Sequence, residues 1–140
     1  MRYLLDTCVV SELLRPQPDG SVIDWLGRQD EASLYLSVLT LGELQKGVSR
    51  LAEGRKLRQI QQWVDDDLAR RFTGRILAID SATATRWGIV TGTAERSGRR
   101  LPVMDSLLAA SALEAGMTLV TRNTADFEST AVPFFDPWTS

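Results

Sequence analysis

Short apolar segments that alternate with helical patterns constrain this chain more than any other feature of its sequence. Four segments have the length and composition of buried strands, and apolar residues at helical spacing follow them: 2–5, 34–37, 76–79 and 118–121. Residues 132–135 could supply a short fifth strand. Strands separated by helices usually pair in parallel, with helices on both faces of the sheet. The sequence therefore predicts a single α/β domain over residues 1–140, with a mostly parallel sheet of about four to five strands.

The helical segments carry recognisable start and stop signals. Thr40 is expected to cap a helix, and Glu43 three residues later completes a capping-box pattern. Residues 54–72 give the clearest amphipathic helix, with charged residues around a single apolar stripe. A further helix is expected from about Asp105 to Ala115, with Gly116 at its C-terminal cap.

The chain contains no histidine, and this absence narrows the chemistry open to it. Catalysis by Ser-His-Asp or Cys-His groups and every histidine-containing zinc site are excluded. Cys8 is the only cysteine, so an internal disulfide is impossible, and its apolar neighbours favour a small core residue over a nucleophile. Carboxylates are then the main candidate ligands, and they favour hard ions such as Mg²⁺ or Mn²⁺.

The overall charge and the hydropathy of the chain limit which partners it can have. The formal charge is −2, so any binding of nucleic acid must use local basic patches. No apolar run approaches the roughly 20 residues that cross a bilayer, and the start lacks a signal-peptide pattern. We expect a cytoplasmic protein that does not associate with membranes.

Acidic residues follow several of the expected strands. Asp6 comes directly after the first strand, Glu43 lies one turn into the helix after the second, and Asp126 follows the fourth. The carboxyl ends of parallel strands share one edge of a sheet, where open α/β sheets bind ligands. Asp105 starts the helix that leads into the fourth strand, so topology places it there less firmly.

Each acid also has a plainer interpretation. Asp6 or Thr7 could cap the following helix, and Glu43 could serve only in the capping box. Asp105 could be an N-cap or a partner of the helix dipole, and Asp126 a solvated loop residue. Asp6, Glu43 and Asp105, however, each stand among apolar neighbours without an adjacent lysine or arginine. Removing an unpaired carboxylate from water is costly, and carboxylates that lie close together repel one another. A shared divalent ion would offset both effects.

These segments together resemble PIN domain ribonucleases. The resemblance rests on Leu4-Leu5-Asp6-Thr7, on Ser37 to Glu43-Leu44, on Asp105-Ser106 and on the segment Thr121-Arg122-Asn123-Thr124-Ala125-Asp126-Phe127. It spans the chain in order and length and is greatest to the VapC-type toxins of bacterial toxin–antitoxin pairs. The start and the ending Phe135-Asp136-Pro137-Trp138 are most similar to the FitB branch.

The resemblance implies a PIN-like three-layer α/β/α sandwich and a set of site residues. Asp6, Glu43 and Asp105 match the metal-binding acids, and Asp126 is favoured as the fourth, with Asn123 as a neutral helper. Thr7 and Thr121 match hydroxyl positions that orient an acid or contact water on the metal. The implied activity is Mg²⁺- or Mn²⁺-dependent hydrolysis of RNA, and the implied partners are a cognate antitoxin and a second copy of the toxin.

Other functions use the same residues and stay open at this point. The acids would equally serve a metal-dependent nuclease acting on DNA or a phosphoesterase acting on small phosphate esters. The amphipathic helices would suit a non-catalytic regulatory binding module. Arg122 and Lys46 could help hold a phosphate or be ordinary surface charges, and the same two interpretations apply to Arg96, Arg99 and Arg100.

Overall fold

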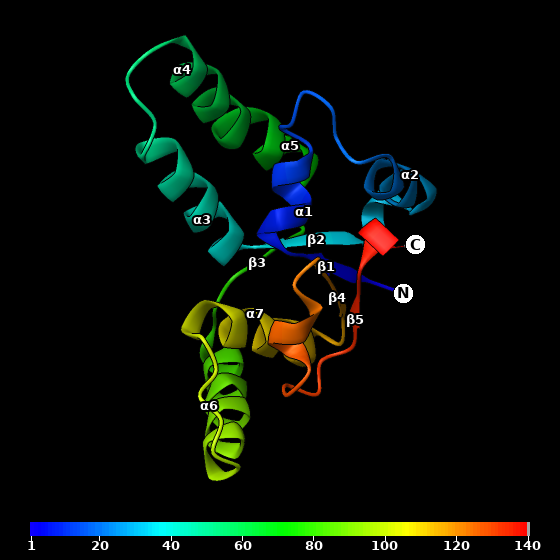
Figure 1. The fold of residues 1–140 in the computed structure, drawn as a ribbon, viewed down its shortest axis with the longest axis vertical. Helices are drawn as coiled ribbons and strands as arrows, with labels where there is room; N and C mark the ends of the chain where they lie inside the picture. The colour runs from blue at the N-terminus through cyan, green and yellow to red at the C-terminus, as the bar shows by residue number, and fades with distance from the viewer. Residues whose placement is uncertain (140) are drawn as a thin grey trace.

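The computed structural model describes residues 1–139, which contain a five-stranded parallel sheet with helices on both faces (Figure 1). The strand order is β3-β2-β1-β4-β5, so β1 lies at the centre between β2 and β4. This order confirms the predicted α/β sandwich, including its fifth strand. The strands are short: β1 Tyr3–Leu5, β2 Leu34–Ser37, β3 Ile76–Leu77, β4 Thr118–Val120 and β5 Phe134–Phe135.

Helices cover the two faces of the sheet unequally. On one face lie α1 (Thr7–Glu12), α2 (Gly20–Arg28), α3 (Val38–Ser49) and a helical stretch made of α4 (Arg55–Gln62), η2 (Trp63–Leu68) and α5 (Ala69–Arg71). On the other face lies α7 (Val103–Ala115), against which α6 (Ser81–Arg96) packs (Figure 1). Three short 3₁₀ turns complete the described chain: Glu31–Ser33, Thr124–Phe127 and Pro137–Thr139.

Alternating side chains of the central strands build two separate cores. Leu5 and Val120 join the core beneath α1, α2 and α3, whereas Leu4 and Leu119 join the core beneath α7. Strands covered on both faces read as continuous apolar runs, which is why the sequence showed runs of leucine and valine and no polar alternation. No helix in residues 1–139 is long and apolar enough to cross a membrane.

The predicted cap of the third helix is wrong. Helix α3 begins at Val38, directly after β2, and its N-cap is Ser37, whose side chain accepts a hydrogen bond from the backbone N–H of Leu39 at 3.0 Å. Thr40 is a fully buried residue inside the helix. The capping-box interpretation of Glu43 fails with it, because Glu43 then lies well past the cap position.

Two further helices differ from expectation, one in its start and one in its type. Helix α7 begins at Val103, so Asp105 lies in its first turn, and no side chain caps the helix there. The N-cap interpretation of Asp105 is therefore wrong. Residues 55–71 are helical as predicted, but the central part, Trp63–Leu68, is a π-helix.

Candidate active site

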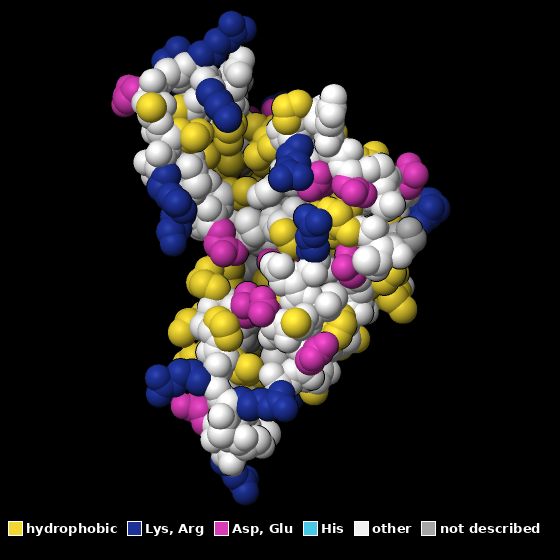
Figure 2. All heavy atoms as spheres, viewed as in Figure 1, with side chains coloured by type: hydrophobic (Ala, Val, Ile, Leu, Met, Phe, Trp, Pro, Cys, Tyr) yellow, Lys and Arg dark blue, Asp and Glu magenta, His cyan; other side chains and the backbone are white. Residues whose placement is uncertain are grey.

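A hollow of about 120 Å³ opens at the carboxyl edge of the sheet, where β1, β2 and β4 end. Its acidic walls come from three elements: Asp6 from the β1–α1 junction, Glu43 from α3 and Asp105 from α7. Acidic side chains border the recess between α3 and α7 in the space-filling view (Figure 2). Thr7, Cys8 and Asn123 line the hollow too, together with the apolar residues Leu39, Met104 and Leu108.

Asp6 is the most firmly held of these acids. It is the N-cap of α1, and its Oδ1 accepts a hydrogen bond from the backbone N–H of Thr7 at 2.7 Å. Its Oδ2 accepts a hydrogen bond from the hydroxyl of Thr121 at 2.8 Å. Burial raises the pKa of Asp6, the two hydrogen bonds lower it, and the charge of Glu43 raises it again; the net direction is upward. Asp6 is therefore a helix cap and a wall of the hollow at once.

Thr7 joins two of the acids. Its backbone N–H donates to Asp6, and its hydroxyl donates to Oε1 of Glu43 at 2.6 Å. This geometry follows from the sharp strand-to-helix turn after Leu5, which aims the first residues of α1 toward α3. Glu43, released from any capping role, lies on the side of α3 that faces the hollow.

Asp105 carries the strongest electrostatic signal of the site. Its pKa is raised to about 6, first by burial and then by the charges of Asp126, Asp6 and Glu43. Four carboxylates from four segments of the chain therefore act on one another, as expected if they gather at one edge of the sheet. Such perturbed acids in a hollow are typical of functional sites.

The last loop contributes in two ways. Asn123 lines the hollow, and its backbone N–H donates to the hydroxyl of Thr121 at 3.1 Å. Asp126, exposed in the 3₁₀ turn, does not line the hollow, yet among the neighbouring charges it has the largest effect on Asp105. The structure thus brings Asn123 to the wall and keeps Asp126 close behind Asp105.

Some residues of this region escaped the sequence analysis. Cys8 packs against the first core, as predicted, but its sulfur also lines the hollow and lies 3.8 Å from Asp6 Oδ2. Glu12 is only 4% exposed and accepts a hydrogen bond from the backbone N–H of Asp19 at 2.9 Å. The signal for Glu12 was available, since it stands one turn after Cys8 between the apolar residues of α1. Lys46 does not line the hollow.

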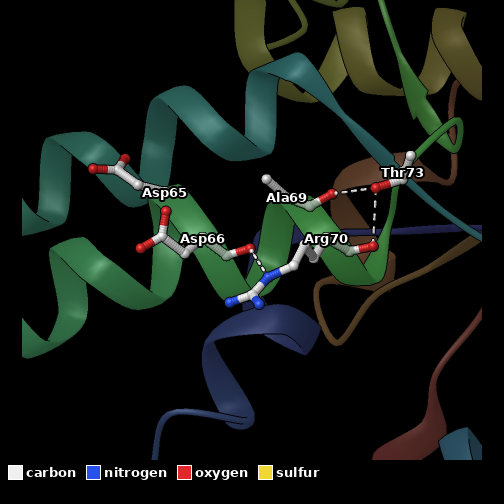
Figure 3. A pocket seen from close by; sticks show the side chains of 5 residues that line it. All are labelled: Asp65, Asp66, Ala69, Arg70 and Thr73. Atoms are coloured by element: carbon white, nitrogen blue, oxygen red, sulfur yellow. Dashed lines mark hydrogen bonds between the residues drawn. The ribbon is translucent and has the colours of Figure 1, made fainter.

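A larger hollow, of about 530 Å³, lies along η2 and α5, away from these acids (Figure 3). It is lined by Asp65, Asp66, Ala69, Arg70 and Thr73. Its polar groups bond within their own helix, since Arg70 donates to the carbonyl of Asp66 at 3.3 Å and Thr73 donates to that of Ala69 at 3.0 Å. We assign the chemistry to the smaller hollow because only that one combines acids from several elements.

The donor set of the smaller hollow fits a hard divalent ion in kind. Carboxylate, hydroxyl and amide oxygens are the ligands that Mg²⁺ and Mn²⁺ prefer. Within residues 1–139, however, no three acidic or cysteine side chains already form a metal-ion cluster. An ion such as Mg²⁺ keeps several waters and needs only one or two of these carboxylates as direct ligands.

Comparison with known proteins identifies the family. A PIN domain model matches residues 3–133. The chain belongs to the PIN domain family. Its parallel sheet and flanking helices are those of the PIN fold, as the sequence resemblance implied.

Individual relatives cover nearly the whole PIN domain. Toxin FitB of Neisseria gonorrhoeae is 36% identical over 96% of this chain and 97% of its own length. VapC ribonuclease Y4jK of Sinorhizobium fredii is 30% identical over 96% of each chain. The crystal structure of FitAcB from Neisseria gonorrhoeae matches with a TM-score of 0.93 and 35% identity, covering 99% of each chain. The resemblance to VapC-type and FitB toxins is confirmed.

Proposed function

We propose that this PIN domain is an endoribonuclease that hydrolyses RNA phosphodiesters with Mg²⁺ or Mn²⁺ and acts as the toxin of a toxin–antitoxin pair. The observation that carries the proposal is the meeting of Asp6, Glu43 and Asp105, from three elements, at one hollow. The names of the relatives support it, since one is a toxin and another a VapC ribonuclease.

Charge argues for a cation in the reaction. A phosphodiester is an anion, and a wall of carboxylates repels it unless positive charge lies between them. Asp6, Glu43, Asp105 and Asp126 would hold a divalent ion, which would supply Lewis-acid chemistry for the hydrolysis of the phosphodiester. This chemistry needs no histidine, in agreement with the composition.

The side chains of the chain divide between binding and positioning. We infer that Asp6 and Asp105 are the central ligands, with Glu43 and Asp126 completing the site. Thr121 and Thr7 keep the two oxygens of Asp6 in place, and the Thr7 hydroxyl fixes one oxygen of Glu43. Asn123 offers a neutral amide at the wall. The hydroxyl groups therefore hold two acids ready for the ion.

Cleavage of total cellular RNA tests this proposal directly. The protein, incubated with Mg²⁺ or Mn²⁺, is expected to cut RNA at mapped positions, and the Asp6→Asn variant is expected to lose at least 100-fold in rate. DNA and a generic phosphodiester, tested under the same conditions, are expected to resist.

Other outcomes select other functions. Equal cleavage of DNA or of small phosphate esters would identify a different metal-dependent nuclease or phosphoesterase. If both Asp6→Asn and Asp105→Asn kept the full biological effect and the parent cut no RNA, the chain would be a binding module. Circular dichroism of each variant checks that it folds.

The partners are also part of the proposal. We infer a cognate antitoxin, because the relative FitB is known in the complex FitAB bound to a DNA fragment, matched with a TM-score of 0.91 and 35% identity. A homodimer follows from the same resemblance, and Val103 and Met104 give α7 an exposed apolar start, 60% and 39% exposed. A toxin that cuts cellular RNA acts in the cytoplasm. Sedimentation of the protein alone measures the dimer.

A further inference from the structure

A second hollow adjoins the acidic one at the start of α1. It has a volume of about 200 Å³ and is lined by Cys8, Ser11, Glu12, Arg15, Arg122 and Trp138. Cys8 lines both hollows, so only the first turn of α1 separates them. We call this second hollow the Arg122–Trp138 pocket. Whatever occupies it lies next to the acids of the candidate active site.

The pocket combines a cationic group and an aromatic face. The guanidinium carbon of Arg122 lies 5.3 Å from the centre of the Trp138 ring, within the range of a cation–π contact. Trp138 is held at its backbone, whose N–H donates to Oδ1 of Asp136 at 2.8 Å. Arg122 directly follows Thr121, the residue that orients Asp6. The arginine is thus tied to both the active-site acid and the indole.

The charges of the pocket do not cancel. Glu12, its only acid, is buried, accepts the backbone N–H of Asp19 and lies 3.6 Å from Arg15 in an ion pair. Arg122 is exposed, and among residues 1–139 it has no carboxylate partner within ion-pair distance. The pocket therefore keeps one free guanidinium, which is suited to an anion.

We propose that the Arg122–Trp138 pocket binds the nucleotide next to the scissile phosphate of a single-stranded RNA. The guanidinium pairs with its phosphate, and the indole or the guanidinium plane stacks on its base. A carboxylate of a peptide would engage only the arginine, whereas a nucleotide offers a phosphate to the guanidinium and a base that can stack on the guanidinium–indole pair, so the pair of groups favours a nucleotide. This inference rests on the proposed ribonuclease function and names a specificity site for it.

Steady-state cleavage of a short RNA that contains the mapped site tests the pocket. Arg122→Ala is expected to raise KM about tenfold and to leave kcat within twofold, because a subsite away from the reacting atoms contributes binding and not chemistry. Trp138→Phe keeps an aromatic face and is expected to retain most of the affinity, whereas Trp138→Leu loses it. Arg122→Lys keeps the charge but not the planar group, so its KM should fall between those of the parent and the alanine variant.

Arg70→Ala is the matched control. It changes the net charge equally, and Arg70 lies on α5 in an exposed pair with Asp67 at 3.1 Å and lines neither of these two hollows. Its KM should equal that of the parent. If Arg122→Ala gives that same unchanged KM while the parent cuts RNA, the pocket inference is wrong and the proposed function stands. A fall in kcat with unchanged KM overturns the pocket inference too, because the arginine would then act on the reaction itself.

Binding measurements separate the two proposals. Fluorescence anisotropy of the same RNA with the Asp6→Asn protein needs no cleavage, and adding Arg122→Ala should weaken binding about tenfold. If the parent cuts no RNA with either ion but this loss of binding is seen, the proposed function fails; the pocket still binds RNA, but its place beside a scissile phosphate is overturned. If Arg122→Ala weakens binding of the antitoxin and not of RNA, the pocket serves a protein partner and the inference is overturned.

Discussion

Single hydroxyl groups decide how the acids of this site are presented. Thr121 is fully buried, donates to Asp6 and accepts from the backbone N–H of Asn123, so it links the central acid to the last loop. Thr7 links Asp6 to Glu43 in the same way. The hydroxyl of Thr121 and the backbone N–H of Thr7 lower the pKa of Asp6, against the larger upward effect of its burial.

Replacing Thr121 by valine keeps most of the volume and removes this support. We expect a loss of about 1–3 kcal/mol in the free energy of unfolding, because a buried hydrogen bond to a charged group disappears. The pKa of Asp6 should rise further, so the affinity for Mn²⁺ should fall. Urea denaturation and calorimetric titration with Mn²⁺ measure the two effects. Thr118→Val, at the start of β4, removes a hydroxyl that only faces the Met1 sulfur at 3.9 Å and should change neither.

The raised pKa of Asp105 gives metal binding a defined pH dependence. Its value of about 6 means that a proton competes with the ion for this carboxylate below that pH. We expect the affinity for Mn²⁺ to weaken by up to about tenfold per pH unit below pH 6 and to depend little on this group above it. Titration calorimetry at several pH values from about 5 to about 8 measures how the Mn²⁺ affinity depends on pH. Asp126→Asn removes the neighbouring charge with the largest effect on the pKa of Asp105, so the pH below which the Mn²⁺ affinity falls should decrease. If that pH stayed the same, the assignment would be contradicted.

The elements of the fold were readable from the sequence to the extent that apolar patterning defines them. The strands and the helices appear where expected, because a buried face needs apolar residues at a fixed spacing. The helix starts were misplaced where the chain uses less common chemistry. Helix α3 follows β2 without a loop, so Ser37 ends the strand and caps the helix at once, and Thr40 only resembles a cap.

The π-helix was out of reach of a simple α-helical pattern, although its cause is visible afterwards. Ile60, Val64, Leu68 and Phe72 recur every four residues. On an α-helix each such step turns the side chain by about 40° away from one line. The wider turn at Trp63–Leu68 opposes this drift and keeps the last three of these side chains buried in the same core.

The start of α7 depends on a hydrogen bond from α6. The indole N–H of Trp87 donates to the hydroxyl of Ser106 at 2.9 Å, and Ser106 is fully buried next to Asp105. We expect Ser106→Ala to reduce the free energy of unfolding by about 1–3 kcal/mol, because the indole N–H loses its partner. Ser111→Ala is the matched control: that hydroxyl is also buried but donates only to the carbonyl of Leu107 in its own helix. Urea denaturation of the two variants compares them, and equal losses would show that the link between the helices is unimportant.

At the scale of the whole molecule, the topology creates the site. Five parallel strands in the order β3-β2-β1-β4-β5 bring the ends of β1, β2 and β4 together. The convergence of Asp6, Glu43 and the loop after β4 was therefore predictable from strand order. The position of Asp105 was not, because it depends on how the start of α7 packs against the same edge. The sequence pattern also could not predict that Asn123, and not Asp126, lines the hollow, because the 3₁₀ turn fixes which side chain points inward.

The acids that gather at this edge of the sheet lower the stability of the metal-free protein. Asp105 has a pKa of about 6 in the folded chain and an ordinary value of 3.8, so the folded state holds its proton more tightly than the unfolded state does. The stability associated with Asp105 is fully present below pH 3.8 and is lost as the pH rises to about 6. Asparagine has no proton to lose. Asp105→Asn should therefore be nearly neutral at pH 4 and stabilising at pH 7, by about 1 kcal/mol or about 3 °C in Tm once solvent screening is allowed for.

The same substitution should remove the benefit of the ion. Any ion that binds only the folded parent stabilises it, by about 2.7 kcal/mol at 100 times the dissociation constant. Thermal unfolding of the parent and of Asp105→Asn, with and without Mn²⁺, should show a less stable metal-free parent that gains more from the ion. Asp24→Asn, which neutralises an exposed acid on α2, should keep the full response to Mn²⁺. If the metal-free parent were more stable than Asp105→Asn at pH 7, the repulsion among these acids would not affect the stability of the whole fold.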